Sequence, residues 1–132
     1  MTQPFLRFDD FEPGRLLGTH EDLVTPELLA EWQRLYPWDA APPGQAPAAM
    51  ATALVMRAYL QVAAPRPPGN VHAAQQLRLH APPDIGEPIR TQVWCESREL
   101  RRERRHVGFR TVSTGRGERP LFEGGLRLVW AA

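Results

Sequence analysis

The longest apolar stretch of the chain covers residues 48–62 (AAMATALVMRAYLQV), which contain no glycine or proline. Good helix formers dominate it, and only Thr52, Arg57 and Gln61 are clearly polar. A helix that is apolar around most of its circumference is stable when it is buried. This segment is too short and, with its central arginine, too polar to cross a membrane. We therefore expect the central helix of the core here.

A shorter helix is expected before it. Thr25, Pro26 and Glu27 combine an N-cap, a proline at the first helical position and an early acid. Pro37 ends the helix. Its apolar stripe follows a spacing of three and four residues: Leu28, Leu29, Trp32 and Leu35.

After Pro68 and Gly69 the hydrophobic period changes to two, which is typical of strands. In residues 89–95 the side chains of Ile89, Thr91, Val93 and Cys95 fall on one face. We expect strands over residues 71–80, 89–100, 104–113 and 121–130, and a further one over 16–24. This order, a strand and two helices before four successive strands, predicts an α+β fold with an antiparallel sheet wrapped around one long helix.

Length and charge narrow the class of protein. With 132 residues the chain is long enough for one domain, residues 1–132, with its own core. The formal charge of +1 argues against a nucleic-acid partner, which requires excess positive charge. A single cysteine, Cys95, and the lack of a typical leader lead us to expect a cytoplasmic protein. The chain contains no lysine, so Schiff-base chemistry is excluded.

Several short motifs, taken together, resemble the MaoC-like hydratase/dehydratase family, whose fold is the hot-dog fold. They are Phe11-Glu12-Pro13-Gly14, Val24-Thr25, the proline- and glycine-containing loop that leads into residues 50–60, and Ile85-Gly86-Glu87. The resemblance extends from about residue 8 to residue 130. It implies a homodimer, or a pair of hot-dog domains, that binds acyl thioesters of coenzyme A or acyl carrier protein in a tunnel at the subunit boundary. We expect no cofactor and no membrane partner.

The resemblance also directs attention to the loop after the short helix. Hydratases of the family carry an Asp there and a His a few residues later, and Asp39 stands where that Asp is expected. No histidine follows it before His72, which could substitute from a neighbouring strand or be structural. Hydration of an enoyl thioester needs a base and a proton donor, so we name Asp39 and His72 as the catalytic candidates.

Three residues near this loop are candidates for substrate binding: Trp38, Gly44 and Met50. The N–H of Gly44 could approach the thioester carbonyl at the positive end of the central helix, or the glycine could simply serve the turn. His20, His80 and His106 are weaker candidates. Because no pair of ligands has metal-site spacing, we expect no metal.

A run of charge follows in residues 98–106, with Arg101 and Arg102 at its centre. Guanidinium groups bind phosphates bidentately, so these two arginines are candidates for the nucleotide end of coenzyme A. The alternative is a solvated hairpin that two glutamates partly neutralise.

Three functions remain open from the sequence. The first is a 2-enoyl/3-hydroxyacyl hydratase or dehydratase, and the second is a thioesterase in which Asp39 orients water. The third is a catalytically silent domain that binds acyl thioesters or pairs with an active partner, which the missing histidine favours.

Overall fold

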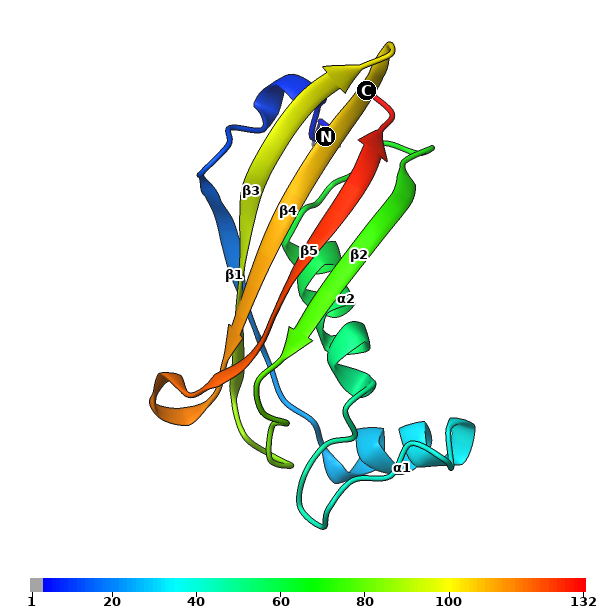
Figure 1. Ribbon diagram of the computed structural model, residues 1–132, viewed down its shortest axis with the longest axis vertical. Helices are drawn as coiled ribbons and strands as arrows, with labels where there is room; N and C mark the ends of the chain where they lie inside the picture. The colour runs from blue at the N-terminus through cyan, green and yellow to red at the C-terminus, as the bar shows by residue number, and fades with distance from the viewer. Residues whose placement is uncertain (1–3) are drawn as a thin grey trace.

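The computed structural model describes residues 4–132 and contains one five-stranded antiparallel sheet with two helices (Figure 1). The strands lie in the order β1-β3-β4-β5-β2, which leaves β1 and β2 at the two edges. Short 3-10 turns, Phe8–Asp10 and Arg116–Glu118, precede β1 and β5. The bounds are β1 Leu16–Asp22, α1 Pro26–Leu35, α2 Met50–Val62, β2 Val71–Leu79, β3 Ile89–Arg101, β4 Arg104–Thr114 and β5 Pro120–Trp130.

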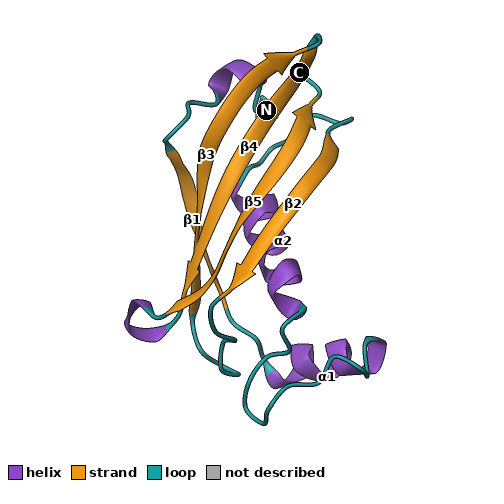
Figure 2. Cartoon of the chain, viewed as in Figure 1, coloured by secondary structure: helices purple, strands orange, loops and turns teal. Residues whose placement is uncertain are grey.

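The central helix α2 packs against one face of the sheet (Figure 2), as its composition predicted. Its buried side chains follow helical spacing: Met50, Ala51, Leu54, Val55, Ala58 and Tyr59. They meet the inward side chains of β3, β4 and β5, among which Phe109, Phe122 and Trp130 are the largest. No helix in residues 4–132 has the length and apolar character needed to cross a membrane.

Two expectations about α2 were wrong in detail. The helix begins at Met50 rather than Ala48, because the segment after Pro47 forms a turn in which the N–H of Met50 donates to the Pro47 carbonyl (3.1 Å). Burial is confined to one face, and Leu60 is 44% exposed. The sheet covers the helix from one side only, so part of its apolar circumference stays outside the core.

The expected start and end of α1 are confirmed. The Thr25 hydroxyl accepts a hydrogen bond from the N–H of Leu28 (3.0 Å), and the helix ends at Leu35, before Pro37. No residue of α1 is fully buried, and Leu35 is 61% exposed. Leu28, Leu29 and Trp32 of the apolar stripe are partly buried against the core, so only the Leu35 end of the stripe remains uncovered within one chain.

The strand expectations are confirmed apart from shifts of one or two residues at their ends. Ile89, Thr91, Val93 and Cys95 are all buried, as the alternating pattern predicted. The hairpin between β3 and β4 closes in two residues, Arg102 and Glu103, both with positive φ (50° and 63°). That conformation suits the twist of a two-residue hairpin but is unfavourable for residues with a side chain.

Candidate functional site

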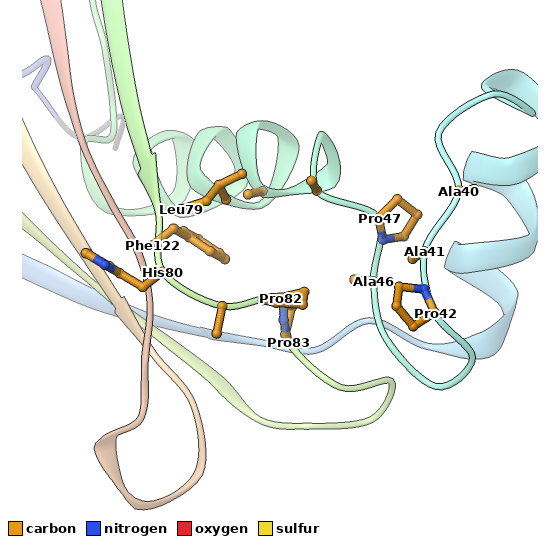
Figure 3. Close-up of a pocket in the computed structure, with 13 residues that line it drawn as sticks. Ala40, Ala41, Pro42, Ala46, Pro47, Leu79, His80, Pro82, Pro83 and Phe122 are labelled. Carbon is orange, nitrogen blue, oxygen red and sulfur yellow. The ribbon is translucent and has the colours of Figure 1, made fainter.

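An apolar cavity of about 200 Å³ lies beside the N-terminal end of α2 (Figure 3). One wall is the loop before α2, and the other is formed by the end of β2, the segment that follows it and Phe122 of β5. Small and cyclic side chains leave this space open. The lining residues are Ala40, Ala41, Pro42, Ala46, Pro47, Ala48, Ala51, Leu79, His80, Ala81, Pro82, Pro83 and Phe122.

Backbone hydrogen bonds hold the two walls together at their base. The Gly44 carbonyl accepts from the N–H of Ile85 (2.8 Å), and the N–H of Ala46 donates to the Pro83 carbonyl (3.0 Å). Gly44 has a φ of +82°, which a residue with a Cβ adopts only at a cost. Its own N–H has no hydrogen-bond partner among residues 4–132. Gly44 therefore serves the turn and also leaves a donor available near the cavity.

An ion pair with a buried carboxylate connects the second wall to the turn between β4 and β5. The Glu87 side chain is 1% exposed and pairs with the guanidinium of Arg119. Its carboxylate also accepts from the N–H of Asp84 (2.9 Å) and of Arg116 (2.8 Å). A Cβ at Gly115 would collide with the same carboxylate, so glycine is required there.

The protonation of Glu87 follows from these contacts. Burial by itself would raise the pKa of its carboxyl group, but the two backbone hydrogen bonds and Arg119 outweigh burial and hold the pKa below its usual value. Glu87 is thus a charged structural support. It is the Glu of the Ile85-Gly86-Glu87 motif, but its partner lies 32 positions later, so local sequence patterns do not predict the pair.

Asp39 lies on the other side of the same loop. Its Oδ2 accepts a hydrogen bond from the indole Nε1 of Trp32 on α1 (2.8 Å). It borders a second, more open cavity of about 310 Å³, together with Trp32, Tyr36, Trp38 and Ala49. Ala49 is the N-cap of α2, so a negative charge at Asp39 is near the positive end of that helix.

The other candidates near this loop differ in their placement. Trp38 shares the second cavity with Asp39 and is 77% exposed, with its ring edge-on to that of Tyr36 (5.9 Å). Met50 is 1% exposed within the core and lines neither cavity. The structure therefore brings Trp38 to Asp39 and keeps the Met50 side chain apart from both cavities.

The remaining candidates lie at the opposite end of the sheet. His72 is the second residue of β2, and Arg101 and Arg102 are at the tip of the β3–β4 hairpin. Because β3 has 13 residues, it spans roughly 40 Å at about 3.3 Å per residue. A single chain thus does not bring these residues to Asp39. Arg101 instead contacts Glu99 (2.9 Å).

His80, a weak candidate from the sequence, is the histidine nearest the apolar cavity in the described part of the chain. In Figure 3 its ring points away from the loop that carries Ala41 and Pro42, on the side where Glu123 lies 3.8 Å from its Nε2. Within residues 4–132, no histidine contacts Asp39. The structure also groups no three potential metal ligands in this range.

The five-stranded antiparallel sheet packed on one helix is a hot-dog fold, the fold class expected from the sequence motifs. The solved structures similar to it share little sequence identity with it. A MaoC-like dehydratase from Rhodospirillum rubrum superposes with a TM-score of 0.77 at 14% identity, over 98% of this chain and 99% of that one.

Two further structures show the same likeness. For an R-hydratase from Pseudomonas aeruginosa the TM-score is 0.77 at 13% identity, over 93% and 84% of the two chains. For the HadBC (3R-hydroxyacyl-ACP dehydratase) complex from Mycobacterium tuberculosis it is 0.65 at 18% identity, over 83% and 89%. No family model and no curated protein matches the sequence itself. The likeness to MaoC-like proteins is therefore one of fold.

Proposed function

We propose that this protein binds an acyl thioester and acts as a 2-enoyl/3-hydroxyacyl hydratase or dehydratase, with Asp39 as the general base. The observation that carries the proposal is the position of Asp39. Its carboxylate is oriented by Trp32, lies near the N-terminus of α2 and directly precedes the loop that lines the apolar cavity. A base, a helix N-terminus and an apolar cavity are three of the features that this reaction requires of a site, and a proton donor is the fourth.

Each part has a role in this proposal. The cavity of about 200 Å³ accepts the acyl group, because its lining is almost entirely aliphatic. The free N–H of Gly44 and the end of α2 stabilise negative charge on the thioester oxygen. Asp39 removes the proton from water, and the Trp32 indole keeps its carboxylate oriented. Carriers that would supply such a group are coenzyme A and acyl carrier protein.

The substitution Asp39→Asn tests the proposal, because it preserves the shape of the side chain and removes its basicity. With a crotonyl thioester, kcat should fall by roughly 10²–10⁴, while the thermal unfolding curve stays unchanged. Asp9→Asn is the matched control, since Asp9 is exposed and lies at the 3-10 turn before β1. Wild-type turnover that survives Asp39→Asn would contradict the assignment of the base.

A catalytically silent domain is the second candidate. The observation in its favour is the lack of a histidine in contact with Asp39 within the described residues of one chain. Such a domain would bind a saturated acyl thioester in calorimetry and turn over no enoyl thioester. A thioesterase would instead release the free thiol of the carrier, which a thiol reagent detects. These assays separate the three functions.

A further inference from the structure

The second cavity, the one that Asp39 borders, is lined mainly by aromatic rings. Three aromatic side chains, one carboxylate and one alanine form it: Trp32, Tyr36, Trp38, Asp39 and Ala49. Its volume is about 310 Å³, whereas a cavity of roughly 150 Å³ already holds a benzene molecule, so a small organic group fits in it. No basic side chain from residues 4–132 lines it. The only charged side chain in this aromatic pocket is therefore that of Asp39.

A tight turn after α1 sets the arrangement of the rings. The N–H of Asp39 donates to the Tyr36 carbonyl (3.0 Å), which closes the turn. The rings of Tyr36 and Trp38 are nearly perpendicular, with an interplanar angle of 81° and centroids 5.9 Å apart. A corner between two perpendicular rings is bounded by a face of each. The Trp32 ring lies 4.6 Å from that of Tyr36, so the three rings form one continuous aromatic wall.

The Asp39 carboxylate has one oxygen in use and one free. Oδ2 accepts the hydrogen bond from the Trp32 indole, and Oδ1 accepts none from any group in residues 4–132. Asp39 also takes part in none of the ion pairs in this part of the chain. Its negative charge thus has no cationic partner within one chain.

The N-terminus of α2 changes this balance only in part. Ala49, its N-cap, lines the aromatic pocket, and a helix N-terminus by itself attracts anions. It is equivalent to about half of a positive elementary charge. The carboxylate carries a full negative charge, so the groups that line the aromatic pocket are negative in sum.

We propose that the aromatic pocket binds an organic cation, a quaternary ammonium group or a methylated amine. Aromatic ring faces carry partial negative charge, and sets of such rings recognise quaternary ammonium groups for that reason. The free Oδ1 of Asp39 adds the opposite charge. A neutral apolar group would leave this charge without a partner, and a small inorganic cation would lose hydration that the rings do not replace.

This inference goes beyond the hydratase function and does not rest on it. The two proposals meet at Asp39, because a bound ammonium group occupies the oxygen that a water molecule would use. If Asp39 is the general base, the cation should therefore inhibit turnover of an enoyl thioester. The aromatic pocket would then give the site a means of regulation by a small cationic metabolite.

The indole N–H signals of the four tryptophans provide a direct test by NMR. Tetramethylammonium chloride should shift the signals of Trp32 and Trp38 in a saturable way. The signal of Trp130 should stay in place, because its Nε1 donates to the Leu6 carbonyl (2.8 Å) and the residue is buried. Sodium chloride at the same concentrations is the control for ionic strength. The absence of a saturable shift at Trp32 and Trp38 would overturn the proposal.

A pair of ligands of the same shape separates charge from apolar contact. Choline should bind more tightly than dimethylbutanol, its neutral isostere, in which carbon replaces the quaternary nitrogen. Calorimetry or the same NMR signals give both affinities. Equal affinity for the two ligands would overturn the proposal, since it would mean that the rings bind apolar groups without regard to charge.

Substitutions in the aromatic pocket should weaken choline binding without changing thermal unfolding. Trp38→Ala should cost about threefold to fivefold in affinity, since Trp38 is 77% exposed and its cation–π contact is partly solvated. Asp39→Asn should cost about fivefold and weaken the dependence on salt. An unchanged affinity in Trp38→Ala would contradict the site.

The matched controls are Phe5→Ala and Asp9→Asn, which remove an exposed aromatic ring and an exposed charge. Both are near the N-terminus, which lies at the other end of the sheet from α1 (Figure 1). Neither should change the affinity for choline. A loss in these controls equal to that in the two pocket variants would overturn the assignment to the aromatic pocket.

The two proposals fail in different ways. Choline binding by a wild type that turns over no enoyl thioester supports the aromatic pocket and overturns the hydratase function. Turnover without choline binding does the reverse. Turnover that saturating choline leaves unchanged would overturn Asp39 as the base and leave the cation site supported by its binding data.

Discussion

Charged side chains are placed differently at the two ends of the sheet. At the cavity end, Glu87 and Arg119 are paired and the carboxylate is buried among backbone donors. At the hairpin end, residues 98–105 hold five arginines and two glutamates, largely in solvent. Buried charge fixes a geometry because each group has a set partner, whereas exposed arginines remain available to a ligand or another chain. The first end therefore has a fixed arrangement of charges, and the second has charges that remain in solvent.

The largest difference between the ends should appear on removal of a carboxylate. Glu87→Ala removes a buried carboxylate and leaves two partly buried backbone N–H groups without their acceptor, while Arg119 can turn to solvent, so the free energy of unfolding should fall by about 1–3 kcal/mol. Glu103→Ala at the hairpin tip should leave it unchanged within error. Urea denaturation at neutral pH measures both. Equal losses of stability for the two substitutions would contradict the difference drawn here between the buried and the exposed carboxylate.

The cavity end should also make stability depend on pH. The folded-state pKa of Glu87 is depressed, so its stabilisation is present above the unfolded pKa near 4.5 and is lost as the pH falls through the folded value. Glu87→Gln should flatten the loss of stability in that acidic range, compared with the wild type. Thermal melts between neutral and acidic pH test this. If the melting temperature of Glu87→Gln falls with pH as steeply as that of the wild type, other carboxylates cause the acid-dependent loss of stability.

At the hairpin end, substitution of the two residues with positive φ should increase the stability of the fold. Replacing Arg102→Asn and Glu103→Gly relieves two positive-φ positions and should raise the free energy of unfolding by about 1–2 kcal/mol. A gain in stability with weaker carrier binding would indicate that the strained arginine is kept for its function. Denaturation and calorimetry on the same variant give both values.

The smallest effect is expected for Arg101→Ala combined with Arg102→Ala. Stability should stay within about 0.5 kcal/mol, since both side chains are exposed. Affinity for a coenzyme A thioester should fall about tenfold, or roughly 1.4 kcal/mol, with a weaker salt dependence. Affinity for the matching pantetheine thioester, which lacks the nucleotide phosphates, should not change. Equal losses for both thioesters would place the arginines away from the phosphates.

Much of the fold could be predicted because its signals are local. The Thr25 cap, the alternation over residues 89–95 and the uninterrupted apolar segment before residue 62 each report on neighbouring positions. The exact start of α2 could not be predicted, because alanines after Pro47 suit both a turn and a helix. The exposure of Leu60 and Leu35 depends on which face of each helix is turned toward the sheet, and helical periodicity alone does not predict that.

Some features of the candidate site could likewise be predicted from the sequence, and others could not. Asp39 was named because the resemblance implies an Asp in the loop after α1, and the structure places Trp38 beside it in the same cavity. The partner of Glu87 and the aliphatic cavity could not be found, since both join segments more than 30 positions apart.

The sequence by itself determined the order of elements and the inward face of β3, because these depend on residue type and near-neighbour spacing. Only the tertiary structure decided that Asp39 and the apolar cavity flank one loop, and that His72, Arg101 and Arg102 lie at the other end. Strand pairing sets those distances, and it depends on contacts between residues that are remote along the chain.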